Sequence, residues 1–244
     1  MHGGELFENV TEFLKEQDAD IVLMQEVYSC DDPTIDRRYR SMQVMPGILG
    51  YKYTHFSPAY RDFDRTGGKA LRGNGIFSKY SLTPKDTIFL DGEYSENYRD
   101  VPGQFGNCPR NLEYAIAQTP AGDIDLFNIQ GVWDMDGDNY SEKRRRMAQV
   151  VVDQVKDVAR VILAGDTNAT PYNQAIIDIE KHLKSAFGKD ELTTTFNMRR
   201  KDNPGYATAA VDMILTSPSI KVVEKSCPDV DISDHLPLVA ILSI

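Results

Sequence analysis

The sequence is poor in cysteine, which excludes folds that depend on disulfides or on structural zinc. Its three cysteines, Cys30, Cys108 and Cys227, are widely spaced and include no CxxC pair. Long apolar runs are missing too, because no segment approaches the roughly 18–20 residues that a membrane span needs. Met1–Glu5 shows neither the basic nor the apolar region of a signal peptide. We therefore expect a cytoplasmic protein without a membrane span.

Positive charge is also in short supply. The 244 residues include 27 Lys and Arg against 37 Asp and Glu, which gives a formal net charge of −10. Binding to duplex DNA normally depends on neutralising phosphates with Lys and Arg, so this balance counts against a tight, non-specific DNA-binding protein. It does not exclude a nuclease, because a metal site itself needs several carboxylates and a local basic groove can exist in an acidic chain.

The chain does contain many short apolar segments and a few amphipathic helices. Helices are predicted at 5–16, 141–158 and 173–187, and strands at 19–27, 51–56, 75–78, 87–90, 115–118, 124–129, 161–164, 211–215, 220–223 and 236–242. Polar segments at 61–72 and 93–110 are predicted as loops, and a loop as long as the second is often functional. This order favours one α+β domain over residues 1–244, a helix-covered β-sandwich, over a doubly wound parallel sheet.

Several of the apolar strands end abruptly in acidic or amide residues. Ile21–Met24 is followed by Gln25-Glu26, and Val161–Ala164 is followed by Gly165-Asp166-Thr167-Asn168. A further carboxylate, Asp212, lies at the start of a predicted strand, and Asp234-His235 precedes the last one. A carboxylate at the end of a buried strand is costly unless it is paired, hydrogen-bonded or metal-bound. The repetition therefore indicates that these strand ends converge on a cation.

These segments also resemble the motifs of the endonuclease/exonuclease/phosphatase superfamily. The resemblance rests on five segments, which occur in the family's order from Ala19 to the C-terminus: Gln25–Val27, Gly73–Ser78, Gly165–Asn168, Val211–Ile214 and Ser233–Pro237. Any one of them is a weak signal, whereas all five in order are a strong one. The resemblance implies a four-layer α/β/β/α sandwich, that is, two mixed β-sheets flanked by helices, and a metal-dependent phosphoesterase activity.

The resemblance assigns the metal to Glu26, with Asp234 as a second ligand or a bridge through water. Their hard oxygen atoms suit Mg²⁺, or Mn²⁺, better than zinc. A cation there would act as a Lewis acid on a phosphoryl oxygen of the substrate.

The matched residues also imply catalytic roles. Asp166 would orient or deprotonate the attacking water, and the amide of Asn168 would hold that water or a phosphate oxygen. His235 would donate to a non-bridging oxygen as charge develops, and Asp212 would orient His235.

The chain departs from the family pattern in two places. The family begins with a strand that ends in Asn, and the first residues here, Met1–Gly4, stand where that strand should already have passed, so the first strand is expected to be lacking. Gln130 stands where many relatives have His; it can hydrogen-bond phosphate but carries no charge.

Substrate contacts are assigned to three further residues. Asn74 is either a strand-start residue or a phosphate contact, and Arg110 is a candidate phosphate clamp. Trp133 either stacks on a base or anchors local packing. The basic run Lys143–Arg146 is interpreted as a solvated helix face, with a position on the rim of the site as the alternative.

The sequence thus predicts a Mg²⁺-dependent hydrolase of phosphodiesters, with nuclease-like enzymes first and DNA among the candidate substrates. A phosphomonoesterase or a tyrosyl-DNA phosphodiesterase-like enzyme is an alternative within the fold. The alternative from a different class is a catalytically weakened protein that binds metal and phosphate.

Overall fold

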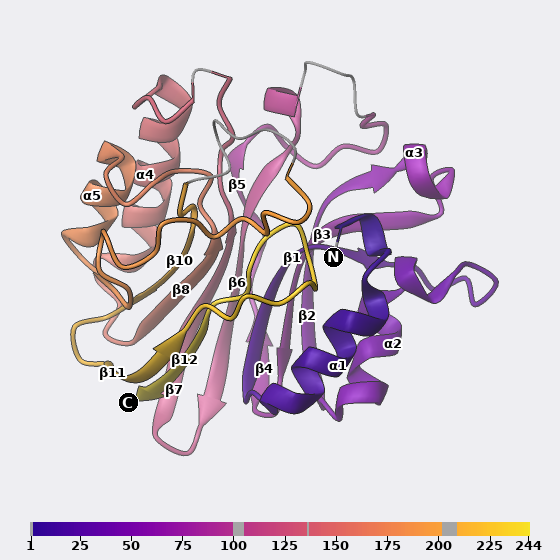
Figure 1. The fold of residues 1–244 in the computed structure, drawn as a ribbon, viewed down its shortest axis with the longest axis horizontal. Coiled ribbons are helices and arrows are strands. Elements are labelled where there is room, and N and C mark those ends of the chain that lie inside the picture. The colour runs from indigo at the N-terminus through magenta and orange to yellow at the C-terminus, as the bar shows by residue number, and fades with distance from the viewer. Residues whose placement is uncertain (1, 100–104, 136, 202–208) are drawn as a thin grey trace.

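Two β-sheets lie face to face and helices cover their outer faces, as seen in Figure 1. The protein is represented by a computed structural model that describes residues 2–99, 105–135, 137–201 and 209–244, so part of the predicted loop 93–110 lies outside the described residues. The predicted α+β, four-layer architecture is confirmed. In the described ranges, no helix has both the length and the apolar character needed to cross a bilayer.

The first sheet consists of β1 (Ile21–Ser29), β2 (Tyr53–Asp62) and β3 (Ala70–Ser78), in the order β1-β3-β2 with antiparallel pairing. Helices α1 (Phe7–Gln17) and α2 (Ser41–Leu49) cover its outer face. The buried side chains that join these helices to the sheet are Phe7, Val10, Val27, Met42, Met45, Tyr51 and Phe77.

The second sheet has seven strands in the order β4-β6-β7-β8-β10-β9, with β5 also paired to β6. These strands are β4 (Ser81–Pro84), β5 (Ile88–Asp91), β6 (Arg110–Thr119), β7 (Gly122–Gln130), β8 (Val161–Asp166), β9 (Lys184–Ser185) and β10 (Asp212–Thr216). Its parallel pair is β7 and β8, which are connected through α4 (Glu142–Val155). Helix α4 and helix α5 (Gln174–Glu180) cover the outer face.

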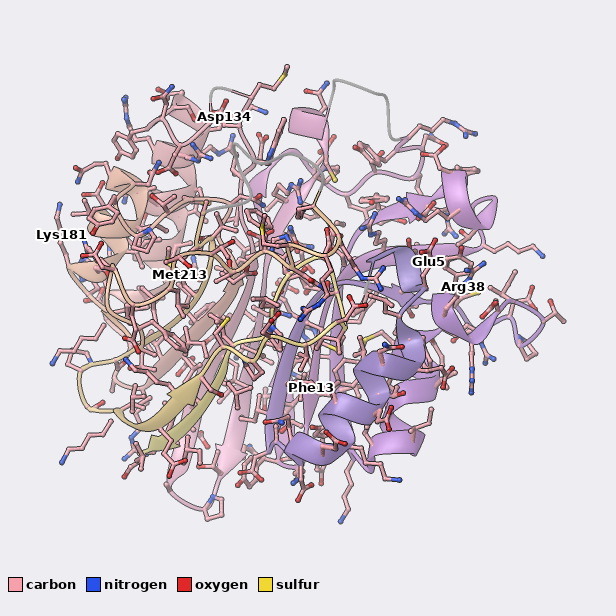
Figure 2. The ribbon with its side chains drawn as sticks, in the orientation of Figure 1. Glu5, Phe13, Arg38, Asp134, Lys181 and Met213 are labelled. Atoms are coloured by element: carbon pink, nitrogen blue, oxygen red, sulfur yellow. The ribbon has the colours of Figure 1, made fainter. Side chains whose placement is uncertain are left out.

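Small and branched side chains fill the space between the two sheets. Ile76 of β3 packs there against residues of β6 and β7, namely Ala115, Ala117, Ile124 and Leu126. A separate two-stranded sheet, β11 (Lys221–Ser226) and β12 (Val239–Ser243), closes the chain. Exposed side chains lie at the rim, for example Lys181 at the end of α5 (Figure 2).

Helix α4 shows how local sequence sets an element. The side chain of Ser141 caps the helix by accepting a hydrogen bond from the backbone N–H of Arg144. Met147, Val151 and Val155 follow at helical spacing and are buried against the second sheet. The predicted helix at 141–158 is therefore present, with its ends trimmed by one and three residues.

Two local predictions were wrong, and one helix was not predicted. The predicted loop at 61–72 contains the end of β2, the short helix α3 (Phe63–Thr66) and the start of β3. The predicted helix at 173–187 ends at Glu180, because 184–185 pair with β10 as β9. Helix α2 was missed: Pro46 and Gly47 argue against a helix, but burial of Met42 and Met45 overrides that propensity.

Short 3₁₀ segments complete the described elements. They are His2–Gly4, Arg37–Tyr39 and Phe105–Asn107.

Candidate active site

Three polar residues occupy one row across the second sheet. Gln130 at the end of β7 lies beside Asp166 at the end of β8, and Asp166 lies beside Asp212 at the start of β10. Residues that are directly opposite on neighbouring strands share a face of the sheet, so the register brings the three side chains together. Asp166 and Asp212 also approach His235: one donor atom from each of the three lies within 4.8 Å of the others.

The Asp166 carboxylate accepts three hydrogen bonds. The backbone N–H of Asn168 donates to Oδ1 at 2.8 Å, and the side-chain amides of Gln130 and Asn168 donate to Oδ2 at 3.0 and 3.1 Å. A carboxylate has about four acceptor positions, so one is left for water or substrate. Burial and the negative charge of Asp212 raise the pKa of Asp166 from 3.8 to about 6, although His235 acts in the opposite direction.

His235 and Asp212 form a hydrogen-bonded pair. The distance from His235 Nδ1 to Asp212 Oδ2 is 2.8 Å, and the edge of the Phe196 ring packs against the imidazole with centroids 4.6 Å apart. Burial alone would lower the pKa of His235, but the charge and hydrogen bond of Asp212 raise it to about 9. The imidazole is therefore a cation at neutral pH, and its contact through Nδ1 leaves Nε2 for an oxygen of the substrate.

Asn168 is held in a left-handed backbone conformation, with φ of 50°. Its side-chain amide donates to the Gly131 carbonyl at 3.0 Å as well as to Asp166. Its own carbonyl accepts a hydrogen bond from Arg144 Nη2 at 2.6 Å. Arg144 is fully buried, so for this residue the solvated-face interpretation of the basic run was wrong. Its guanidinium, reaching across from α4, supports the turn that carries Asp166 and Asn168.

Glu26 lies where β1 departs from regular pairing. The register with β3 shifts between Met24 and Val27, and Glu26 itself has a φ of 58°. This bulge places a half-exposed carboxylate between two guanidinium groups: Arg72 Nη2 donates to Oε2, and Arg110 Nη1 lies 4.0 Å from Oε1. Burial would raise the pKa of Glu26, but these two arginines together hold it below its usual value.

Asp234 immediately precedes His235 and lies in a cationic environment. Its Oδ2 is 3.3 Å from Lys201 Nζ, and the Ser233 hydroxyl donates to its Oδ1 at 3.1 Å. Burial would raise its pKa, but the charges of His235 and Lys201 hold the pKa of Asp234 well below its usual value. The carboxylate is ionised throughout the neutral range.

Glu26 and Asp234 fit a hard divalent cation. The negative charge of Asp234 opposes the effect of the two arginines on the pKa of Glu26, so the two carboxylates are electrostatic neighbours and a cation between them would relieve their repulsion. Asp166 fits this role less well, because three N–H donors already point at its oxygens. The Asp212 and His235 atoms that face each other are joined by their own hydrogen bond. Asp166, Asp212 and His235 also offer ligand atoms close enough together to hold a metal ion, but their hydrogen bonds already use part of that capacity.

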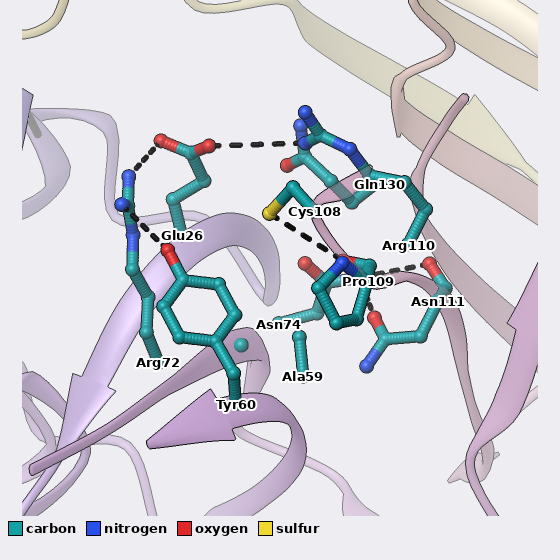
Figure 3. A pocket seen from close by; sticks show the side chains of 11 residues that line it. Glu26, Ala59, Tyr60, Arg72, Asn74, Cys108, Pro109, Arg110, Asn111 and Gln130 are labelled. Atoms are coloured by element: carbon teal, nitrogen blue, oxygen red, sulfur yellow. Dashed lines mark hydrogen bonds and ion pairs between the residues drawn. The ribbon is translucent and has the colours of Figure 1, made fainter. Parts of the chain in front are cut away.

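A pocket of about 260 Å³ lies beside Glu26 and Gln130 (Figure 3). It is lined by residues of β1, β2, β3, β6 and β7, among them Arg72 and Arg110. Asn74 also lines it, but its amide is held by the side chain and carbonyl of Asn111 at 2.8 and 3.2 Å. This residue serves to join the two sheets. Trp133, half-buried in the loop after β7, is not among the lining residues.

Three residues near the site, Arg72, Arg144 and Lys201, were not predicted as site residues. Arg72 was assigned to a polar loop, and Arg144 was grouped with the other basic residues of the run 143–146. A helical projection would have found Arg144, because it precedes Met147 by three residues and so lies on the apolar face of α4. No local pattern singles out Lys201.

Comparisons with known proteins identify the family and the fold of the chain. The model of the Endonuclease/Exonuclease/phosphatase family matches residues 4–235. Among solved structures, an endonuclease/exonuclease/phosphatase from Beutenbergia cavernae has a TM-score of 0.72 at 19% identity, covering 96% of this chain and 65% of that one. The chain thus spans just under two thirds of that protein.

Two other solved structures are similar over most of both chains. Mannosyl-6-phosphatase Bt3783 from Bacteroides thetaiotaomicron has a TM-score of 0.64 at 17% identity, covering 99% of this chain and 92% of that one. The human Nocturnin catalytic domain, with a bound sulfate anion, has a TM-score of 0.68 at 16% identity, covering 98% and 86%. No curated protein matches by sequence. At these identities the structures show a shared fold.

Proposed function

Because the chain belongs to the Endonuclease/Exonuclease/phosphatase family, whose members are phosphoesterases, we propose that it hydrolyses a phosphodiester by metal-assisted attack of water. The observation that carries this proposal is the arrangement around Asp166. A buried carboxylate, held by Asn168 and Gln130, lies beside a charged His235–Asp212 pair. A base with one open acceptor position next to a cationic donor suits the attack of water on a phosphorus atom.

In the proposed reaction, Asp166 accepts a proton from the attacking water while the oxygen of that water bonds to phosphorus. His235, oriented through Nδ1 by Asp212, donates from Nε2 to a non-bridging oxygen as negative charge develops there. Glu26 and Asp234 would hold Mg²⁺ or Mn²⁺, which supplies Lewis-acid stabilisation of the same phosphoryl group. The ester oxygen leaves opposite the attacking water. A reducing, cytoplasmic setting is part of the proposal, and the free state of all three cysteines supports it.

The first test is hydrolysis of bis-p-nitrophenyl phosphate with Mg²⁺ or Mn²⁺, and again with EDTA. We expect release of p-nitrophenolate that EDTA stops and excess metal restores. Glu26→Gln should raise the metal concentration for half-maximal rate by about tenfold or more, because it removes a charged oxygen ligand. Glu12→Gln, on the exposed side of α1, is the matched control and should change nothing. Hydrolysis that survives EDTA, or none at all, contradicts the proposal.

A phosphomonoesterase is the second candidate, and the guanidinium of Arg110, which lies beside Glu26 and interacts electrostatically with Asp166, favours it. A monoester carries more negative charge than a diester, which suits an additional Arg. The mannosyl-6-phosphatase among the similar structures has such a substrate by its name. Running p-nitrophenyl phosphate beside the diester separates the two candidates, because the better substrate has the higher kcat/KM.

The pH dependence of kcat/KM should be bell-shaped. Asp166 has to be ionised to accept a proton, so the rate should rise with pH as this group titrates near its pKa of about 6. His235 has to keep its proton to donate, so the rate should fall as the pH passes its pKa of about 9. The profile in diester hydrolysis measures both limits. In His235→Gln the kcat/KM that remains should no longer decrease at alkaline pH. A decrease that persists would show that another group causes it.

A further inference from the structure

The pocket beside Glu26 carries more positive charge than its own residues compensate. Of its lining residues, Arg72 and Arg110 are cationic and Glu26 is anionic. Burial raises the pKa of the Cys108 thiol, so that group stays neutral and adds no negative charge. Both arginine side chains are about nine-tenths buried, at 10% and 11% exposed. The chain as a whole is strongly acidic, so this local excess of positive charge is not a consequence of general composition.

Arg72 is held in place from two sides while part of its donor capacity stays unused. Nη2 donates to Glu26, and Nη1 donates to the Tyr60 hydroxyl at 2.8 Å. In the described part of the chain, Nε is buried and has no hydrogen-bond partner. An unsatisfied buried N–H of a charged group is costly, and phosphate and carboxylate oxygens are the acceptors to which a guanidinium N–H bonds most strongly. Arg110 faces the same carboxylate at 4.0 Å, so its pairing is incomplete.

Gln130 marks the boundary between this pocket and the reaction centre. It lines the pocket and also donates to Asp166. Glu26 stands between the two guanidinium groups in Figure 3, with Arg72 and Tyr60 on the side away from Gln130. A group seated against Arg72 would thus lie across Glu26 from Gln130, which donates to the Asp166 carboxylate.

We propose that this pocket binds a second, non-reacting phosphate group, so that the preferred substrate is a phosphate ester with two anionic groups. That the bound phosphate is part of the substrate rests on the proposed function, whereas binding of phosphate to the pocket is independent of it. Arg72 is the central contact, through the Nε–H that has no partner in the described residues, and Arg110 adds charge at the other side of Glu26. Free phosphate offers the same chemistry, so the test has to separate it from a substrate group.

The pocket itself is tested by calorimetric titration with inorganic phosphate in EDTA, which needs no turnover. The wild type should bind phosphate, and Arg72→Met should weaken binding by roughly tenfold or more, since a charge-assisted contact is lost. Arg72→Lys, which keeps the charge, should give an intermediate value. His235→Ala should change binding less than about threefold if the sites are separate. Arg61→Met, whose guanidinium pairs with Glu96, is the matched control and should match the wild type.

Three results would overturn the assignment of the pocket as a phosphate site. They are no binding of phosphate by the wild type, unchanged binding in both Arg72 variants, and loss of binding in His235→Ala. Melting temperatures of all variants show whether each is folded.

A matched pair of esters then decides whether the ligand is part of the substrate. One is p-nitrophenyl propyl phosphate, and the other carries a phosphonate at the far end of the propyl chain. In the wild type the KM of the phosphonate-bearing ester should be lower by about tenfold, and Arg72→Met should abolish this ratio. Equal KM values in the wild type would mean that the pocket takes free phosphate only, which overturns the substrate proposal. If the wild type hydrolyses neither ester, the proposed function is refuted. The calorimetric titration would still show whether the pocket binds phosphate.

Discussion

Asp166→Asn is expected to lower kcat by about 10³-fold, because a neutral amide cannot accept the proton of the attacking water. The carboxylate has three N–H donors around it and one acceptor position left, and that position is the one the mechanism uses. KM should change little, since the contacts that hold the phosphate come from other residues. Single-turnover and steady-state hydrolysis of bis-p-nitrophenyl phosphate measure both parameters. Asp153→Asn, an exposed carboxylate on α4, is the matched control and should keep the wild-type rate.

The variant should remain folded, for reasons that follow from the pKa of the group. The pKa of Asp166 is raised from 3.8 to about 6, so the folded state favours the protonated carboxyl. The stability this contributes is complete below pH 3.8 and lost as the pH rises through 6. At about pH 8 the wild type lacks this stabilisation, because the Asp166 carboxylate is ionised. A neutral Asn removes the buried charge, but its amide N–H faces one of the N–H groups that donate to Asp166 in the wild type. We expect a melting temperature within about 4 °C of the wild type. A folded variant with unchanged kcat would exclude Asp166 as the base.

The carboxylates at the strand ends could be predicted from the sequence, whereas two of the cationic residues beside them, Arg72 and Lys201, could not. Glu26, Asp166 and Asp212 stand out because an apolar run stops or starts at each of them, and a buried carboxylate needs a compensating partner. Which residues supply the compensation depends on pairing between distant strands. Arg72 reaches Glu26 only because β3 lies beside β1 in the first sheet. No local pattern contains that information.

The elements of the fold divide in a similar way. Helix α4 was predicted because its hydrophobic periodicity is strong and Ser141 is a typical N-cap, and strand β8 was predicted because its residues form a short apolar run. Helix α2 was not, because its stability comes from packing of Met42 and Met45 against the first sheet and not from its own propensity. The segment 184–185 became a strand because β10 offers it a free edge. In both cases tertiary contacts outweigh the local preference of the chain.

Arg144→Met should lower the free energy of unfolding by about 2–4 kcal/mol, because one buried and two partly buried carbonyl groups lose their donor. The fully buried guanidinium donates to the carbonyls of Gly137, Asn139 and Asn168, and the hydrophobic isostere can satisfy none of them. For a chain of this size the loss corresponds to a fall in melting temperature of about 5–15 °C. Thermal unfolding measures it directly. Arg146→Met, an exposed position two residues along the same helix, is the matched control and should show almost no change.

Activity separates a positioning role of Arg144 from a purely structural one. The contact with the Asn168 carbonyl holds the turn whose backbone N–H donates to Asp166 and lowers its pKa. If the turn relaxes in Arg144→Met, the pKa of Asp166 should rise and the acidic limb of the pH–rate profile should move to higher pH. At a temperature where the variant is folded, kcat should also fall by about tenfold or more, because the base is displaced from the attacking water.

Arg144→Lys tests the same point without removing the charge. A single ammonium group cannot reproduce the fork of a guanidinium that donates to three carbonyls, so this variant should lie between the wild type and Arg144→Met in both stability and rate. A lower melting temperature with a wild-type pH profile and kcat would restrict Arg144 to stability. A displaced acidic limb in both variants would mean that a buried cation on α4 sets the ionisation of the catalytic carboxylate through the backbone of Asn168, without contact with the substrate.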